Sequence, residues 1–214
     1  SIEQARRDPR TIALSYGSRQ ILEEAGAWPV AATPIHEIHV SRRGRFGRSL
    51  MDRAEHGVDA LGYVARYGDV VAVLSEECAR QGITTLRPAL VTGSTEDAEG
   101  VTVALERAGV VSDIRAQLLA QAEGGLFGQQ TERAVSRDYG QSAIIAWVKV
   151  DAPIAHRAYE RFTDDGPLAL LPQDDGYALV WCVPPTRAEQ LLALDDTAFL
   201  ARLGVAFGSR LGRF

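Results

Sequence analysis

The chain has 214 residues, of which 46% are hydrophobic, and a formal net charge of −5. This size and composition suit a globular protein with a sizeable core, and they argue against wholesale disorder. The acidic balance disfavours nucleic acid as a partner. The two cysteines, Cys78 and Cys182, form no CxxC pair, so neither a disulfide framework nor a metal site is expected.

No apolar run reaches the roughly 18 residues that span a bilayer. Charged residues interrupt any apolar segment in the first 30 positions, so no signal peptide is expected. These features predict a cytoplasmic location, with peripheral contact at the inner membrane left open. The chain does not begin with Met, and its two ends resemble positions inside a longer protein.

Hydrophobic periodicity predicts an alternation of helices and strands along the chain. We expect a helix over 13–25, a strand over 34–41, a Gly/Arg loop over 42–48, a strand over 61–65 and a helix capped by Asp69 and ending near 79. Short strands are expected at 84–86, 90–93, 101–105 and 113–122, with a turn at 94–100. Further strands are expected at 142–150, 157–162, 168–171 and 177–183, with a hairpin turn at 174–176, and two helices between 187 and about 207, capped by Thr186 and by Asp195 or Asp196.

This order predicts an α+β (mixed α/β) fold without internal repeats. Residues 1–33 and 61–132 are expected to form part of a nucleotide-binding layer. Residues 34–60 and 133–214 are expected to form a second domain built on a β-sheet.

The histidines and paired carboxylates give little support to hydrolase or metal chemistry. His36 and His39 are three positions apart on a predicted strand, where side chains point to opposite faces, so we expect them not to share an ion. No GxSxG motif occurs, and the pairs of aspartates at 164–165, 174–175 and 195–196 are typical of turns and helix caps.

A cluster of arginines occupies the predicted loop at residues 42–48, namely Arg42, Arg43, Arg45 and Arg48. Three interpretations remain open: a solvated loop, a surface that steers an anionic cofactor or an NADPH phosphate, and a docking site for an anionic membrane.

Several segments together resemble the FAD-dependent aromatic hydroxylases, in particular the 2-octaprenyl-6-methoxyphenol hydroxylase branch of ubiquinone biosynthesis. The matching segments are residues 8–15 (DPRTIALS), 38–47 (IHVSRRGRFG), 60–64 (ALGYV), 133–141 (RAVSRDYGQ), 160–172 (ERFTDDGPLALLP), 178–181 (ALVW) and 210–214 (RLGRF). The segment at 160–172 is the most specific, and the likeness covers nearly the whole chain.

The resemblance implies a Rossmann-like FAD-binding domain interleaved with a β-sheet substrate domain. The GxGxxG motif and the later Gly-Asp motif of the family are absent from this sequence. Arg10 matches a cofactor-contacting arginine, Arg66 is a weaker candidate, and Glu123 and Gly124 stand where the family has Asp-Gly. A surface ion pair with Asp8 is the alternative role for Arg10. A guanidinium can donate two hydrogen bonds to a pyrophosphate, which supports the cofactor role.

By the same resemblance, FAD reduced by NAD(P)H would use O2 to hydroxylate a polyprenyl phenol, and no protein side chain is assigned as catalytic. Leu168, Leu170, Val180 and Trp181 could line the substrate channel, with core packing as the alternative. No flavin is expected to stay bound to residues 1–214 alone. A non-catalytic binding or assembly module, working with ubiquinone-pathway partners, is the second hypothesis.

Overall fold

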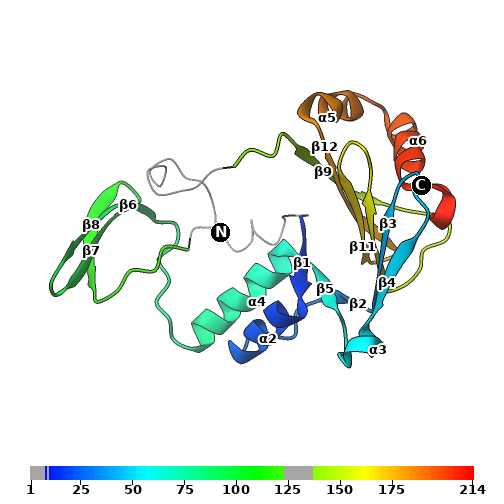
Figure 1. Cartoon of the computed structure of the whole chain (residues 1–214). Helices are drawn as coiled ribbons and strands as arrows, with labels where there is room; N and C mark the ends of the chain where they lie inside the picture. The colour runs from blue at the N-terminus through cyan, green and yellow to red at the C-terminus, as the bar shows by residue number, and fades with distance from the viewer. Residues whose placement is uncertain (1–7, 9, 123–136) are drawn as a thin grey trace. The chain divides into compact units, whose positions relative to one another are not determined.

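The computed structural model describes residues 8, 10–122 and 137–214. The chain divides into two compact units. The smaller contains Gln81–Arg137, the larger contains Ile2–Arg80 with Asp138–Phe214, and each is described by itself. Helices and strands are mixed along the described chain, with seven consecutive strands, β6 to β12, between α4 and α5 (Figure 1), which confirms the predicted α+β class. No helix of the described residues is both long and apolar enough to cross a bilayer.

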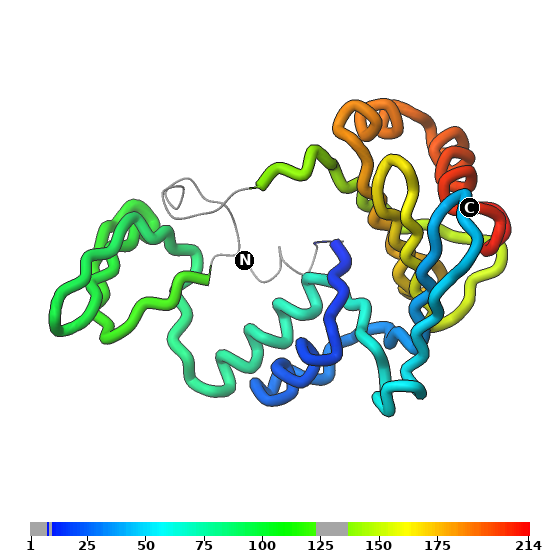
Figure 2. Tube along the Cα trace, viewed as in Figure 1, coloured from blue at the N-terminus to red at the C-terminus, as the bar shows by residue number. Residues whose placement is uncertain are grey.

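The larger unit contains a six-stranded sheet with the order β4-β3-β10-β11-β12-β9. Its strands are β3 (Glu37–Arg42), β4 (Arg48–Asp52), β9 (Ser142–Val148), β10 (Arg157–Phe162), β11 (Pro167–Gln173) and β12 (Gly176–Val183). β3 and β10 pair in parallel, whereas the other neighbours are antiparallel. Segments from opposite ends of the sequence therefore lie side by side, as Figure 2 shows for the blue-to-cyan and yellow parts of the chain.

Two helices and a short 3-10 turn cover one face of this sheet: α5 (Pro185–Leu192), α6 (Asp196–Phe207) and η1 (Ser209–Leu211). Asp195 caps α6 by accepting a hydrogen bond from the Ala198 amide at 2.8 Å. The main core lies between helices and sheet, and its largest fully buried side chains include Trp181, Tyr159 and Tyr177. The opposite face of the sheet has no helical cover among the described residues.

A three-stranded sheet with the order β1-β5-β2 forms the second part of the larger unit. Its strands and helices are β1 (Thr11–Ser15), α2 (Tyr16–Glu24), β2 (Ala32–Ile35), α3 (Arg53–His56), β5 (Gly62–Arg66) and α4 (Tyr67–Arg80). The Ser15 hydroxyl accepts a hydrogen bond from the Ser18 amide and so starts α2 directly after β1.

The two sheets of this unit meet in a small apolar cluster. Ile35 of β2 and Val64 of β5 pack against Ala158 on the uncovered face of the six-stranded sheet. The Thr11 hydroxyl donates a hydrogen bond of 2.9 Å to the side-chain carbonyl of Gln173, which joins β1 to β11. These contacts fix one end of the uncovered face and leave its middle open.

The smaller unit is an antiparallel meander of β6 (Leu90–Asp97), β7 (Gly100–Arg107) and β8 (Val110–Ala116). Alternate residues of the central strand are buried, namely Val101, Val103 and Leu105. Period-2 alternation of this kind is typical of a sheet with one packed face.

Several predicted boundaries were wrong. Residues 13–15, predicted as the start of a helix, belong to strand β1, because pairing with β5 outweighs their helical spacing. Residues 94–97 continue β6, and the turn occupies only 98–99. The described chain has no strand at 84–86, and β8 ends at Ala116.

Two predicted caps were also wrong, because α4 starts at Tyr67, before Asp69, and α5 starts at Pro185, before Thr186. The predicted Gly/Arg loop is shorter than expected, since Arg42 still belongs to β3 and Arg48 already belongs to β4.

Candidate functional site: a cleft between the two sheets

An open cleft of about 830 Å³ lies where the three-stranded and six-stranded sheets of the larger unit meet. Its lining residues come from four places in the sequence: Asp8, Arg10, Thr11, Arg66, Ile145, Ala146, Trp147, Gln173, Asp174 and Asp175. The volume falls within the range of ligand and cofactor sites, about 300–1,000 Å³. The structure thus brings both predicted arginines, Arg10 and Arg66, to one cleft.

Arg10 lies just before β1 and is exposed at the edge of the cleft. Its guanidinium forms an ion pair with Asp8, with Nη2 2.6 Å from Oδ2, and lies 5.2 Å from the centre of the Tyr67 ring. The hydrogen bonds from Arg10 lower the pKa of the Asp8 carboxyl. The ion pair with Asp8 is therefore present, while the exposed guanidinium stays accessible to a ligand.

Arg66, the last residue of β5, pairs with Asp174 in the turn between β11 and β12, with Nη2 2.7 Å from Oδ2. Both side chains are more than half exposed, so water screens the pair and its contribution to stability is small, about 0–1 kcal/mol. A smaller hollow of about 230 Å³ shares Arg66, Gln173 and Asp174 with the cleft. An anionic ligand could replace Asp174 as the partner of Arg66 at little cost.

The β11–β12 turn is the hairpin predicted from Asp174-Asp175-Gly176, and it positions the wall of the cleft. The indole Nε1 of Trp147 donates to the Gln173 carbonyl oxygen at 3.4 Å. A Cβ at position 176 would lie 2.5 Å from the Val148 carbonyl oxygen, so only glycine allows β12 to approach β9 this closely. The Gln173 carbonyl oxygen and the close approach of β12 to β9 therefore hold the Trp147 ring in place.

Lys149 connects Trp147 to the acidic turn. Its Nζ lies 2.9 Å from the Asp175 carboxylate and 5.6 Å from the centre of the Trp147 ring. The hydrogen bond from Lys149 lowers the pKa of Asp175. Cationic and anionic groups thus alternate along this wall.

The uncovered face of the six-stranded sheet continues from the cleft and is largely apolar. Strand register places these side chains on it: Ile38, Val40, Ala158, Phe162, Ala169, Leu171, Ala178, Val180, Ile145 and Trp147. Glu160 lies in the middle, paired in register with Val40 and Ala169. The half-buried carboxyl has no hydrogen-bond or ion-pair partner among the described residues, and burial raises its pKa.

The four predicted substrate-lining residues divide between the two faces of the sheet. Leu168, Leu170 and Trp181 are buried in the core beneath α5 and α6, the packing that the sequence left as their alternative role. Val180 lies on the uncovered face and is half-buried. A substrate-lining role for any of the four stays a prediction, and only Val180 faces open space. Glu123 and Gly124 lie outside the described residues.

Sequence reasoning did not identify Glu160, Trp147 or Gln173 as site residues. A signal for Glu160 was present, because it is a single carboxylate within a strand whose same-face neighbours, Ala158 and Phe162, are apolar. Trp147 and Gln173 became candidates only through contacts with segments distant in the sequence.

Three of the histidines pack against other side chains of the fold. His36 stacks on His156 with ring centres 4.3 Å apart, whereas His39 is buried against Arg210, with Nε2 2.5 Å from the Arg210 Nη1. The described residues contain no group of three or more His, Cys, Asp and Glu side chains suited to a metal ion.

Replacing Glu160 by Gln is expected to raise the free energy of unfolding at neutral pH, because the change removes a desolvated carboxylate while keeping its size. Burial holds the folded-state pKa of Glu160 above its ordinary value of 4.5, so the folded protein binds this proton more tightly than the unfolded chain does. The difference in free energy of unfolding between Glu160→Gln and the wild type should therefore grow as the pH rises from 4.5 through the folded-state pKa. Denaturant unfolding at a series of pH values measures it, and a pH-independent difference would contradict the assignment.

The fold is that of flavin-dependent monooxygenases and halogenases. The flavin-dependent halogenase CmlS matches with a TM-score of 0.70 at 17% identity, covering 92% of this chain and 39% of CmlS. The p-nitrophenol 4-monooxygenase PnpA from Pseudomonas putida DLL-E4 matches with a TM-score of 0.68 at 16% identity, covering 97% of this chain and 54% of PnpA.

In sequence, the chain is similar to ubiquinone-biosynthesis hydroxylases over nearly its whole length. It is 28% identical to the ubiquinone hydroxylase UbiL of Rhodospirillum rubrum, covering 96% of this chain and 49% of UbiL. It is 27% identical to the 3-demethoxyubiquinol 3-hydroxylase of Escherichia coli, covering 96% of this chain and 54% of that enzyme. The uncharacterized protein slr1300 of Synechocystis is 31% identical, with 99% of this chain and 53% of slr1300 covered.

The chain thus spans about half the length of the curated relatives it matches. No protein-family model matches it. The predicted resemblance to the FAD-dependent aromatic hydroxylases of the ubiquinone branch is confirmed by these relatives.

Proposed function

We propose that this chain is the substrate-binding sheet and part of the FAD-binding layer of a flavin-dependent aromatic-ring monooxygenase of ubiquinone biosynthesis. The observation that carries the proposal is the cleft, because it joins two arginines and a fixed aromatic wall to an apolar sheet face. The names of the curated relatives supply the reaction class, hydroxylation in ubiquinone biosynthesis.

The chemistry of the cleft fits a flavin dinucleotide. Arg10 and Arg66 would bind the phosphates, since each guanidinium can donate paired hydrogen bonds to anionic oxygens. Trp147 lines the same cleft and offers an aromatic surface. When bound, FAD reduced by NAD(P)H would supply the activation of O2. Glu123 and Gly124 stay candidate contacts to the same cofactor.

The uncovered sheet face would take the substrate. A polyprenyl phenol needs an apolar surface for its chain and a polar group for its ring hydroxyl, and this face provides both through Val180, Ile145 and Glu160. With its raised pKa, the Glu160 carboxylate would accept the hydrogen bond from the phenol hydroxyl and withdraw its proton as the ring is oxygenated. The apolar residues around it would exclude water.

Isotope-labelled O2 tests the reaction class in the native protein that contains this chain. With NAD(P)H and a prenylated phenol present, the phenol should gain an oxygen atom from O2, detected by mass spectrometry. Glu160→Gln should raise the KM for the phenol and leave phenol-independent NAD(P)H oxidation unchanged. Unlabelled phenol, in a protein that binds it, would instead support the second hypothesis, a non-catalytic binding module.

A further inference from the structure

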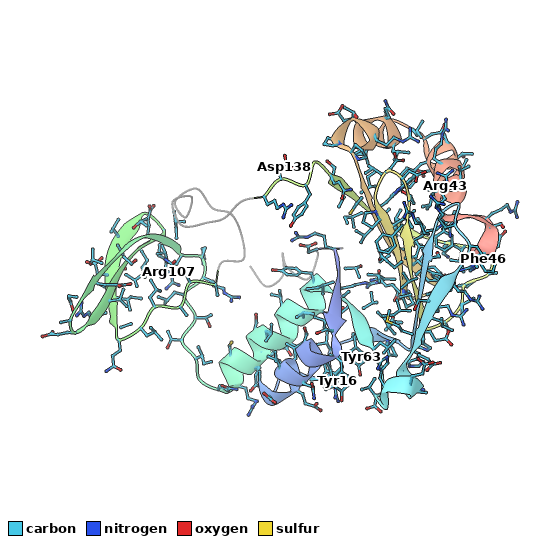
Figure 3. All side chains as sticks on the ribbon, viewed as in Figure 1. Tyr16, Arg43, Phe46, Tyr63, Arg107 and Asp138 are labelled. Carbon is cyan, nitrogen blue, oxygen red and sulfur yellow. The ribbon has the colours of Figure 1, made fainter. Side chains whose placement is uncertain are left out.

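The loop that joins β3 to β4 combines dense positive charge with a fully exposed aromatic ring. We call residues 42–48 the basic hairpin; its arginines are Arg42, Arg43, Arg45 and Arg48, and its tip carries Phe46. All five side chains are exposed, and Phe46 has a relative exposure of 109%. Figure 3 labels Arg43 and Phe46. None of them lines the cleft between the two sheets.

The positive charge of the basic hairpin is uncompensated. None of its four arginines forms an ion pair or side-chain hydrogen bond with another described residue. Two further arginines lie beneath the hairpin: Arg161 donates to Ser41 and to the Ala206 carbonyl oxygen, and Arg210 contacts His39. Burial, followed by the nearby charges of Arg210 and Arg43, lowers the pKa of Arg161. Cations therefore crowd one edge of a protein whose net charge is −5.

The hairpin also holds its tip in a defined position. Ser41 pairs with Arg48 across the two strands, and the Arg43 amide donates a hydrogen bond of 2.9 Å to the Phe162 carbonyl oxygen. A phenylalanine held wholly in water forgoes the stabilisation that burial would give, about 1.5–3 kcal/mol. Such an arrangement suits a partner that takes up an aromatic ring and binds cations around it.

We propose that the basic hairpin docks on an anionic lipid bilayer, with Phe46 inserted among the acyl chains and the surrounding arginines bound to lipid phosphates. Basic residues near an anionic membrane and an apolar side chain at the interface are the two attractions that hold peripheral proteins there. Nucleic acid fits less well, because the patch is confined to one hairpin edge and the rest of the chain is acidic. This proposal does not depend on the proposed oxygenase activity.

Co-sedimentation of the native protein with lipid vesicles tests the proposal without any turnover. The wild type should bind vesicles of mixed phosphatidylcholine and phosphatidylglycerol and fail to bind pure phosphatidylcholine. Arg43→Gln with Arg45→Gln should weaken binding about 30-fold, from roughly 1 kcal/mol for each lost cation. Phe46→Ser should weaken it about ten-fold in high as well as low salt.

Arg87→Gln with Arg107→Gln is the matched control, since it removes two exposed arginines from the other unit. Binding of this control should equal that of the wild type, and thermal midpoints should agree among all variants. Absence of wild-type binding to anionic vesicles would overturn the proposal. Equal losses of vesicle binding in the control and in the hairpin variants would overturn the proposal too, because the vesicles would then attract the protein through its overall charge.

Discussion

Leu168→Ala should lower the free energy of unfolding by about 3 kcal/mol, whereas Val180→Ala should lower it by about 1 kcal/mol or less. Leu168 is fully buried beneath α5 and α6, where truncation leaves a cavity that close packing cannot refill. Val180 is half-buried on the opposite face, where solvent can fill the space. Denaturant unfolding of the native protein measures both changes.

The same two variants should rank in the opposite order by their effect on the KM for the phenol. If the uncovered face takes the phenol, Val180→Ala should raise its KM, while folded Leu168→Ala should keep the wild-type KM. A raised KM in Leu168→Ala with an unchanged one in Val180→Ala would place the substrate beneath the helices and contradict the proposed arrangement.

Arg10→Gln and Arg66→Gln should each weaken FAD binding by about 10- to 100-fold, the effect expected when one charged hydrogen-bonding partner of a phosphate is lost. Lysine at position 66 should restore only part of the affinity, because it keeps the charge but lacks the paired geometry of a guanidinium. Equilibrium titration of the flavin-free native protein with FAD measures the dissociation constants.

Arg19→Gln provides the matched control for this series. Arg19 also has an acidic partner, Glu23 at 3.2 Å, and an aromatic neighbour, Trp28, with its guanidinium 5.8 Å from the ring centre. It is not among the cleft residues. Affinity losses of equal size in Arg19→Gln and Arg66→Gln would mean that the effect arises from stability rather than from contact with the cofactor.

The sequence predicted much of the six-stranded sheet, because its later strands are long, apolar and separated by clear turn residues. The hairpin at Asp174-Asp175-Gly176 and the strands on either side of it followed from short-range rules. Strand β1 at residues 11–15 did not follow from such rules. Its pairing with β5 depends on a segment about 50 residues away in the sequence, and this pairing overrides the local helical spacing.

The site was predictable only in part, for a physical reason. Alternation along β11 and β12 places Leu168 and Val180 on opposite faces, but both faces are apolar, and only tertiary packing decides which one the helices cover. The pairing of Arg66 with Asp174 joins residues 108 positions apart, so no local pattern could indicate it. The resemblance indicated Arg10 and Arg66 singly as cofactor contacts, whereas nothing in the sequence indicated that they meet in one cleft.

If the cleft between the two sheets binds the flavin, as we propose, the native protein should retain FAD through gel filtration. Absorbance should show about one FAD per chain in the wild type and in Arg19→Gln. The double variant Arg10→Gln with Arg66→Gln should lose the flavin while remaining folded. A colourless wild type, or a double variant that retains FAD as firmly as the wild type, would show that the flavin does not bind in this cleft.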